Sequence, residues 1–236
     1  MSRFDRAVLT LLRAPSYPLD VHEVEDLTAH CRRIHFSAPE LLAGQAIAPT
    51  FWLRLWIPVG GQEVQRAYTV TEVRRDAGLF AADFVLHDTP GPASDWARAA
   101  APGAKLRATV YPGALFALPD PPPNGYLLLG DPASLPAINE ILKALPETVP
   151  ARILLHRQHD DDPKLTVHTR PNDSLEWTDL TTTGEALSGD LDGWHAWVAT
   201  ETGVTRRLRA TLHQRLPKAA VKARGYWIAG RPMGRS

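Results

Sequence analysis

Two short segments of the sequence carry residue types that could bind a phosphorylated cofactor. The first, Gly91-Pro92-Ala93-Ser94, opens a predicted helix shortly after a predicted strand. Because the first amides of a helix have no partner within the helix, such a start can bind phosphate. Gly91 allows the backbone to approach a ligand closely, Pro92 presets the turn, and Ser94 could either cap the helix or donate to a phosphate oxygen.

The second segment, Arg66-Ala67-Tyr68-Thr69, lies about twenty residues upstream in a predicted strand. In a strand, Arg66 and Tyr68 project from one face and Thr69 from the other. A guanidinium can donate two hydrogen bonds to one phosphate, whereas the tyrosine ring could stack on a flavin or fill a core. A pyrophosphate needs both a cation and clustered amide donors, so the two segments together favour a flavin dinucleotide.

The composition limits the classes of protein. The chain has 236 residues and is 44% hydrophobic, which suits one large or two modest globular domains. Basic and acidic residues balance at 26 each, so nucleic acid is not an expected partner. The single cysteine, Cys31, excludes an internal disulfide and a thiolate cluster, and agrees with a cytoplasmic location. No run reaches the about 20 apolar residues of a membrane span.

The elements that position these residues fall into two halves around a proline-rich linker, residues 119–125. The first half, residues 1–118, begins with a predicted amphipathic helix from Phe4 to Ala14, and one further helix follows Pro92. Short strand-like segments separated by turns otherwise fill it, as in an antiparallel barrel or sandwich. These segments are 21–36, 51–58, 64–70, 78–87 and 105–111.

The second half, residues 126–236, alternates between strand and helix patterns. Predicted strands cover 126–129, 152–156, 194–199 and 226–229, and amphipathic helices cover 135–145 and 205–216. This alternation favours a parallel sheet covered by helices.

The order of motifs along the chain resembles the siderophore-interacting proteins, a family of ferric-siderophore reductases related to ferredoxin–NADP reductases. The resemblance covers residues 21–230. It rests on Arg66-Ala67-Tyr68-Thr69, Phe84-Val85-Leu86-His87, Gly91-Pro92-Ala93-Ser94 with Trp96-Ala97, Leu127-Leu128-Leu129-Gly130-Asp131, Leu135-Pro136-Ala137-Ile138, Trp197-Val198-Ala199 and Gly225-Tyr226-Trp227.

The resemblance implies a two-domain β plus α/β fold: an antiparallel six-stranded FAD-binding barrel, then a parallel-sheet NAD(P)-binding-like domain. It implies that electrons pass from NADPH or NADH through FAD to a ferric siderophore or other ferric chelate, whose iron leaves as Fe(II). No catalytic residue and no metal site are assigned. The residues implied to bind cofactors are Arg66, Ala67, Tyr68, Thr69, His87, Gly91, Pro92, Ala93, Ser94, Trp96, Gly130, Asp131, Ser134 and Trp227.

Several positions depart from the family pattern. Ala133 replaces a threonine, although Ser134 beside it could substitute, and Thr200 replaces a glycine. Thr71 and Ile228 stand where the family has basic residues that would attract an anionic siderophore. Two alternatives therefore stay open: a reductase of another acceptor, such as a quinone or a redox protein, or a flavin-binding protein with a degenerate nicotinamide site.

Two further features permit more than one interpretation. His156, His159 and Asp160–Asp162 form the one cluster that could suggest a metal, but no ligand spacing fits and a solvated loop is favoured. Arg157 and His159 follow the second strand of the C-terminal sheet, where a 2′-phosphate is often bound, which hints at NADPH. Trp227 could approach the flavin or pack in a core.

Overall fold

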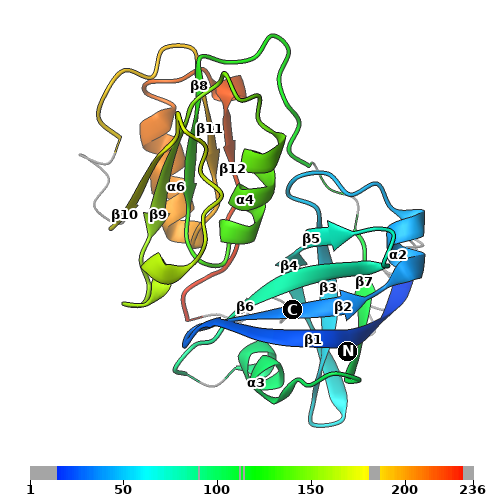
Figure 1. The fold of residues 1–236 in the computed structure, drawn as a ribbon. Coiled ribbons are helices and arrows are strands. Elements are labelled where there is room, and N and C mark those ends of the chain that lie inside the picture. Colours follow the sequence, from blue (N-terminus) through cyan, green and yellow to red (C-terminus); the bar gives the residue numbers. More distant parts are fainter. Residues whose placement is uncertain (1–14, 90, 112, 114, 181–186, 231–236) are drawn as a thin grey trace. The chain divides into compact units, whose positions relative to one another are not determined.

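The computed structural model describes residues 15–89, 91–111, 113, 115–180 and 187–230. The chain forms two compact units that divide between Leu115 and Phe116, and each unit is described separately below (Figure 1). The helix predicted for Phe4–Ala14 lies outside the described residues. Among the described residues, no helix is long and apolar enough to cross a membrane.

The first unit is a curled antiparallel sheet with two helices. Its strand order is β4-β3-β7-β1-β2-β6-β5. The elements are β1 (Ser16–Thr28), β2 (Cys31–Ser37), α2 (Pro39–Gly44), β3 (Trp52–Val59), β4 (Gln62–Thr69), β5 (Thr71–Arg74), β6 (Leu79–Val85), α3 (Pro92–Ala99) and β7 (Lys105–Thr109).

The predicted antiparallel barrel architecture is confirmed, with two differences in its elements. The sheet has seven strands where six were expected, and α2 is a helix that the sequence did not indicate. Both omissions have the same cause, because β5 has only 4 residues and α2 only 6. Segments this short contain too few residues to show a hydrophobic period.

The direct joint between β4 and β5 makes this sheet curl. β4 and β5 occupy opposite edges of the sheet, yet only Val70 separates them along the chain. A flat sheet of seven strands could not bring its edges within one residue of each other, so the strands wrap around a core. That core includes Leu19, Ile34, Phe36, Leu53, Leu55, Phe80 and Phe84, all at most 1% exposed.

The second unit is a parallel sheet of order β10-β9-β8-β11-β12 between helices. Its elements are β8 (Gly125–Gly130), α4 (Leu135–Ala144), β9 (Ala151–His156), a 3-10 turn (Asp162–Lys164), β10 (Ser174–Thr178), β11 (Trp194–Val198), α6 (Thr202–Leu212), a second 3-10 turn (Lys218–Ala220) and β12 (Val221–Ala223). The predicted parallel sheet with helices is confirmed.

Two strands of this unit differ from the prediction. The last strand is β12, whereas the predicted strand at 226–229 is wrong, since Trp227 there forms only an isolated bridge with Glu201. The apolar run around Trp227 predicted a buried strand, but its side chains are half-buried or exposed and do not fill a core. β10 was missed because its residues Ser174–Glu176 are exposed and show no apolar pattern.

The helices of the second unit cover opposite faces of the sheet (Figure 1). Leu127 and Leu129 of β8 share a buried cluster with Val204 and Leu208 of α6. Alternate residues point to the other face, where Ile138 of α4 lies. The first strand in sequence, β8, stands in the middle of the sheet, and the strand order reverses between β8 and β11. In such folds ligands bind beyond the carboxyl ends of the strands at this reversal point.

Candidate cofactor sites

Among the described residues, the N-cap of α3 leaves the first amides of the helix without a side-chain acceptor, as a phosphate site requires. Gly91 is the N-cap residue in an extended conformation, with φ −155° and ψ 147°, and Pro92 begins the helix. Gly91 has no side chain to accept from the amides of Ala93 and Ser94, so no side-chain cap forms. The buried Ser94 hydroxyl donates to the Gly91 carbonyl at 3.1 Å, so this hydroxyl stabilises the first turn of α3.

One basic side chain, Arg32, fixes the other end of α3. The Arg32 guanidinium of β2 donates to the carbonyl oxygens of Ala97, at 3.0 Å, and Arg98, at 2.9 Å. Asp26 holds Arg32 in place through two hydrogen bonds of 2.7 and 3.0 Å. The hydrogen bond from Arg32 lowers the pKa of Asp26. A cation at the carboxyl end of a helix also complements the helix dipole, so Arg32 both orients and stabilises α3.

The predicted strand residues lie on two faces of β4. Arg66 and Tyr68 pair with Leu55 and Leu53 of the neighbouring strand β3. Because both leucines are fully buried, this is the core-facing side of β4. The Tyr68 ring lies 4.2 Å from the Phe84 ring, measured between centroids. This burial raises the pKa of the Tyr68 phenol, and the nearby charge of Arg66 offsets part of the increase.

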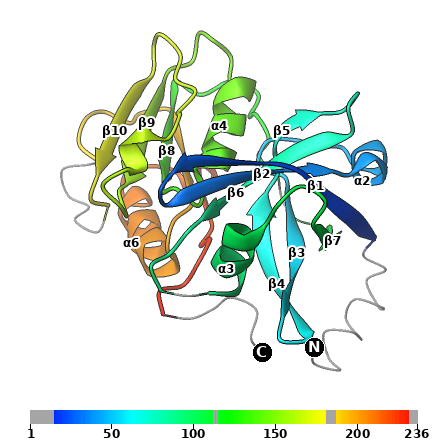
Figure 2. The same ribbon diagram turned by 60° about the horizontal axis from the view of Figure 1, so that its bottom comes forward.

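Phe84 connects the strand residues to α3. Its ring centroid is 5.7 Å from that of Trp96, which also stacks on Phe36 at 6.4 Å. The chain Tyr68–Phe84–Trp96 therefore brings β4, β6 and α3 together, and Figure 2 shows α3 beside the β3–β4 hairpin. The sequence placed Phe84 in a motif but gave it no role, because a contact between strands that are not neighbours in the sheet has no signature in local spacing.

Three other predicted residues lie apart from this aromatic chain. Ala67 is exposed and Thr69 is buried, and both are on the opposite face of β4 from Tyr68. His87 is exposed just after β6, where its carbonyl oxygen accepts from Arg98 at 3.1 Å. Their roles toward a flavin remain predictions.

In the second unit, Gly130, Asp131, Ser134 and Trp227 meet at the carboxyl end of β8. A Cβ atom on Gly130 would lie 2.5 Å from Ile138 Cδ1 and from Ser134 Oγ, so only glycine fits between strand and helix here. The Asp131 side chain is completely buried. Its Oδ1 accepts from the Ser134 amide at 3.2 Å, and its Oδ2 accepts from Trp227 Nε1 at 2.8 Å.

The turn between β8 and α4 is also closed by its own backbone and hydroxyl groups. The Asp131 amide donates to Ser134 Oγ at 2.9 Å, and the Ser134 hydroxyl donates to the Asp131 carbonyl at 3.1 Å. Burial raises the pKa of Asp131 to about 6, although the hydrogen bonds from Trp227, Ser134 and Ala133 oppose the increase.

Thr200, which replaces a glycine of the family pattern, points its side chain into the interior of the second unit. Thr200 is 1% exposed, and its hydroxyl lies 3.0 Å from that of Thr205. The next residue, Glu201, caps α6 by accepting from the amides of Gly203, at 2.5 Å, and Val204, at 3.0 Å. The Thr200 side chain, which stands where the family has glycine, is therefore buried against Thr205 of α6 and does not project into solvent.

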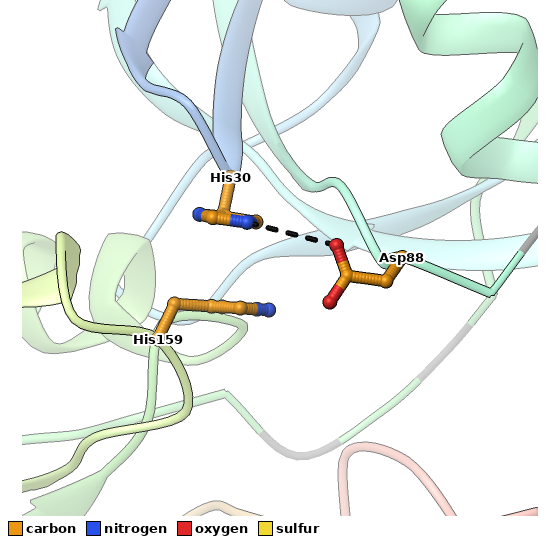
Figure 3. A group of neighbouring side chains, drawn as sticks. All are labelled: His30, Asp88 and His159. Atoms are coloured by element: carbon orange, nitrogen blue, oxygen red, sulfur yellow. Dashed lines mark ion pairs between the residues drawn. The ribbon is translucent and has the colours of Figure 1, made fainter.

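Asp162, one of the acidic residues considered as part of a metal cluster, makes hydrogen bonds within its own loop. Its side chain is 1% exposed and accepts from the amides of Gln158 and His159. The loop is therefore organised around a buried carboxylate, and the expected solvated loop is wrong for Asp162. In the first unit, Figure 3 shows an ion pair between His30 Nε2 and Asp88 Oδ1 at 3.7 Å. It joins the β1–β2 turn to the segment after β6.

Both halves of the chain match models of one protein family. Residues 45–114 match the siderophore-interacting FAD-binding domain, and residues 123–230 match the siderophore-interacting protein model. The chain is 37% identical, in an alignment that covers 99% of its length, to a mycobactin import ATP-binding/permease protein of Mycolicibacterium thermoresistibile. It spans only 27% of that relative's length.

Two further comparisons cover different shares of the chain. A ferric vibriobactin reductase of Vibrio cholerae is 32% identical over 102 residues, which are 42% of this chain and 36% of that one. The siderophore-interacting protein of Acinetobacter baumannii has a similar fold, with a TM-score of 0.80 at 23% identity over 93% of each chain. The chain therefore belongs to the siderophore-interacting protein family and carries its FAD-binding domain.

Proposed function

We propose that this chain is a flavin-dependent reductase that passes electrons from NAD(P)H through FAD to a ferric siderophore or another ferric chelate. The carrying observation is the match, in order along one chain, of an FAD-binding domain and a siderophore-interacting domain. The similarity of part of the chain to a ferric vibriobactin reductase supports ferric iron as the acceptor.

The residues of the first unit fit an FAD. The open amides of Ala93 and Ser94 would bind its pyrophosphate, and the Arg66 guanidinium would bind a phosphate oxygen. The Tyr68 ring, supported from behind by Phe84, would contact the flavin ring system, with His87 at its edge. When bound, FAD would supply a centre that accepts two electrons together and gives them up singly.

The balance of the reaction follows from this chemistry. One NAD(P)H is oxidised to NAD(P)⁺ with release of one proton, and two ferric chelates each gain one electron. Fe(II) is a weaker partner than Fe(III) for the hard oxygen ligands of a siderophore. Reduction therefore releases the iron.

The second unit supports a nucleotide as the electron donor through its topology. Its order reversal at β8 and β11 is the place where dinucleotides bind in related folds. Gly130, Asp131, Ser134 and Trp227 lie there. The half-buried Trp227 would contact the nucleotide, and the buried Gly130, Asp131 and Ser134 would form the turn beneath it. Arg157 and His159 follow β9, which supports NADPH as the donor.

One relative that covers nearly the whole chain supports a partner. Because a relative over 99% of this chain is an import ATP-binding/permease protein, we propose that an importer of the same kind delivers the ferric siderophore. Reduction would then occur in the cytoplasm, where the imported chelate arrives.

The decisive experiment separates acceptor from donor. The purified protein is loaded with FAD, reduced anaerobically with dithionite, and mixed with ferric siderophore in a stopped-flow spectrometer. Reoxidation well above the rate for free reduced flavin is expected, together with Fe(II) captured by ferrozine. Equal rates for protein and free flavin would exclude the iron role, and fast turnover with a quinone alone would favour the alternative acceptor.

Mixing the oxidised protein with NADH or NADPH tests the donor, since an unbleached flavin band indicates a degenerate nicotinamide site.

A further inference from the structure

The indole of Trp227 spans the two central strands of the second unit at their carboxyl ends. The backbone around Trp227 follows the end of β11, because the Tyr226 amide donates to the Thr200 carbonyl at 2.9 Å and the Trp227 carbonyl accepts from the Thr202 amide at 2.8 Å. The indole nitrogen, in contrast, donates to Asp131 beyond the end of β8. One side chain thus bridges the point where the strand order reverses.

Asp131 is held rigidly enough to determine where this ring lies. Its carboxylate is completely buried, and Oδ1 is occupied by the Ser134 amide while Oδ2 faces the indole. The adjacent prolines, Pro132 and Pro136, restrict the backbone on both sides of the turn. Asp131 and Trp227 are 96 residues apart in sequence, so their hydrogen bond joins the turn after β8 to the segment after β12.

We propose that Asp131 is a positioning residue that fixes the indole of Trp227 across the strand-order reversal, where the nicotinamide dinucleotide would bind. This role rests on the proposed function for its effect on the reaction, whereas the placement of the indole does not. Trp227 is half-buried, so part of the residue is accessible to a ligand. Without the carboxylate, the ring keeps its backbone anchor to Thr202 and loses the hydrogen bond that sets its orientation.

The placement is tested first by NMR, independently of activity. The full chain, loaded with FAD, is labelled with ¹⁵N at its tryptophan indoles, and the Trp227 signal is assigned as the one missing from Trp227→Phe. In Asp131→Ala this resonance should shift upfield and its proton should exchange faster with water, as a lost carboxylate acceptor requires. The other indole resonances should stay in place. An unchanged Trp227 resonance in a folded Asp131→Ala protein overturns the proposal.

The effect on the reaction is tested by separating its two halves. In Asp131→Ala, flavin reduction by NAD(P)H should slow about tenfold, the loss expected for one hydrogen bond to a charged group. Trp227→Phe should slow it similarly, and the double variant should be no slower than Trp227→Phe alone, because both changes remove one interaction. Reoxidation of dithionite-reduced protein by the ferric chelate should remain at the wild-type rate. Losses that add, or that appear equally in both halves, indicate a general structural role and contradict positioning.

A matched control and a conservative variant complete the test. Asp173 is another carboxylate with no exposed side-chain surface in this unit, and it accepts from the amides of Ala151 and Arg170. Asp173→Asn should lower the stability and leave the Trp227 resonance and the flavin reduction rate unchanged. Compared with Asp131→Ala, Asp131→Asn should partly restore the Trp227 resonance and the flavin reduction rate. Its amide oxygen can accept from the indole, while its NH₂ group faces the Ser134 amide. If wild-type flavin is reduced by neither nucleotide, the proposed donor is wrong, and the indole resonance alone decides the placement.

Discussion

The starts of α3 and α4 contain similar residues and have opposite chemistry. Both helices begin with a proline in the first turn and a nearby serine. At α3 the cap is Gly91, whose lack of a side chain leaves the first amides without a capping acceptor among the described residues. At α4 the Asp131 carboxylate takes the Ser134 amide from inside the turn. A helix start is therefore an anion site only when the chain does not supply the anion itself.

The same contrast explains why the two units differ in how well the sequence indicates their ligands. The residues Arg66 to Trp96 form one local constellation, and their arrangement around Phe84 agrees with a phosphate and ring site. At α4, the motif Gly130–Ser134 looked like a nucleotide turn, yet its polar atoms bond to one another. A sequence motif shows which groups are present, whereas only the fold shows which of them remain free.

The largest expected effect comes from giving α3 the carboxylate that α4 has. In Gly91→Asp the new side chain can accept from the Ala93 and Ser94 amides. The backbone there is extended, and a Cβ atom would meet Ser94 Oγ at an ordinary 3.6 Å. We expect FAD to bind about a thousandfold more weakly, because two amide–phosphate hydrogen bonds are lost and like charges repel. Titration of the apoprotein with FAD, followed by flavin fluorescence, measures this.

The control for this variant separates charge from bulk. Gly91→Ala adds the Cβ atom without an acceptor and should bind FAD nearly as the wild type does. The apo form of Gly91→Asp should melt at a slightly higher temperature than wild type, because an aspartate N-cap stabilises a helix over a glycine N-cap by a few tenths of a kcal/mol. Tight FAD binding by Gly91→Asp would show that the pyrophosphate lies elsewhere.

The closed turn at α4 should show itself in the pH dependence of stability. The folded pKa of Asp131 is raised to about 6 from the unfolded value of 3.8. The folded state therefore binds the proton more tightly, and the buried charge costs about 3 kcal/mol above pH 6, falling to zero as the pH drops toward 4. Asp131→Asn should lack this slope.

Urea unfolding of both proteins at pH 4, 5, 6 and 7 measures the difference. Asp26, Asp173 and Glu201 have lowered pKa values and produce the opposite slope, but they cancel when wild type and variant are subtracted. Parallel curves for the two proteins would show that Asp131 titrates normally.

A smaller effect should follow from loosening α3 at its far end. Arg32→Met removes the donors to the Ala97 and Arg98 carbonyls, so α3 is held less firmly and its open amides are less well aligned. We expect about tenfold weaker FAD binding, corresponding to about 1.4 kcal/mol. Lys105→Met removes an exposed cation of the same unit, which pairs with Asp20, and should leave the affinity unchanged. Equal losses in both variants would point to net charge and away from helix orientation.

The smallest effect is expected at Tyr68. Tyr68→Phe keeps the ring against Phe84 and removes the hydroxyl group. If the ring acts by stacking, FAD affinity should change by less than about threefold, within the range of one weak contact. A much larger loss, measured in the same titration, would assign the contribution to the phenol hydroxyl.

The sequence predicted the fold through its periodic elements and missed those whose positions depend on distant partners. β8 and α4 have continuous or amphipathic apolar patterns and were found almost to the residue. β10 and β12 are short edge strands with few buried residues, so local pattern alone could not locate them. The Asp131–Trp227 hydrogen bond and the Arg32 contacts to α3 were equally invisible, because each joins residues more than 60 positions apart.

The pairing of the first strand with the last gives the first unit a fixed order of assembly during synthesis. Ser16 of β1 pairs with Thr109 of β7, which in turn pairs with β3. The strand carrying Arg66 and Tyr68 and the helix beginning at Pro92 therefore leave the ribosome before the sheet that supports them can close. Because contacts of such long sequence separation form late, the flavin site should become competent only after β7 emerges, while the second unit is still being made.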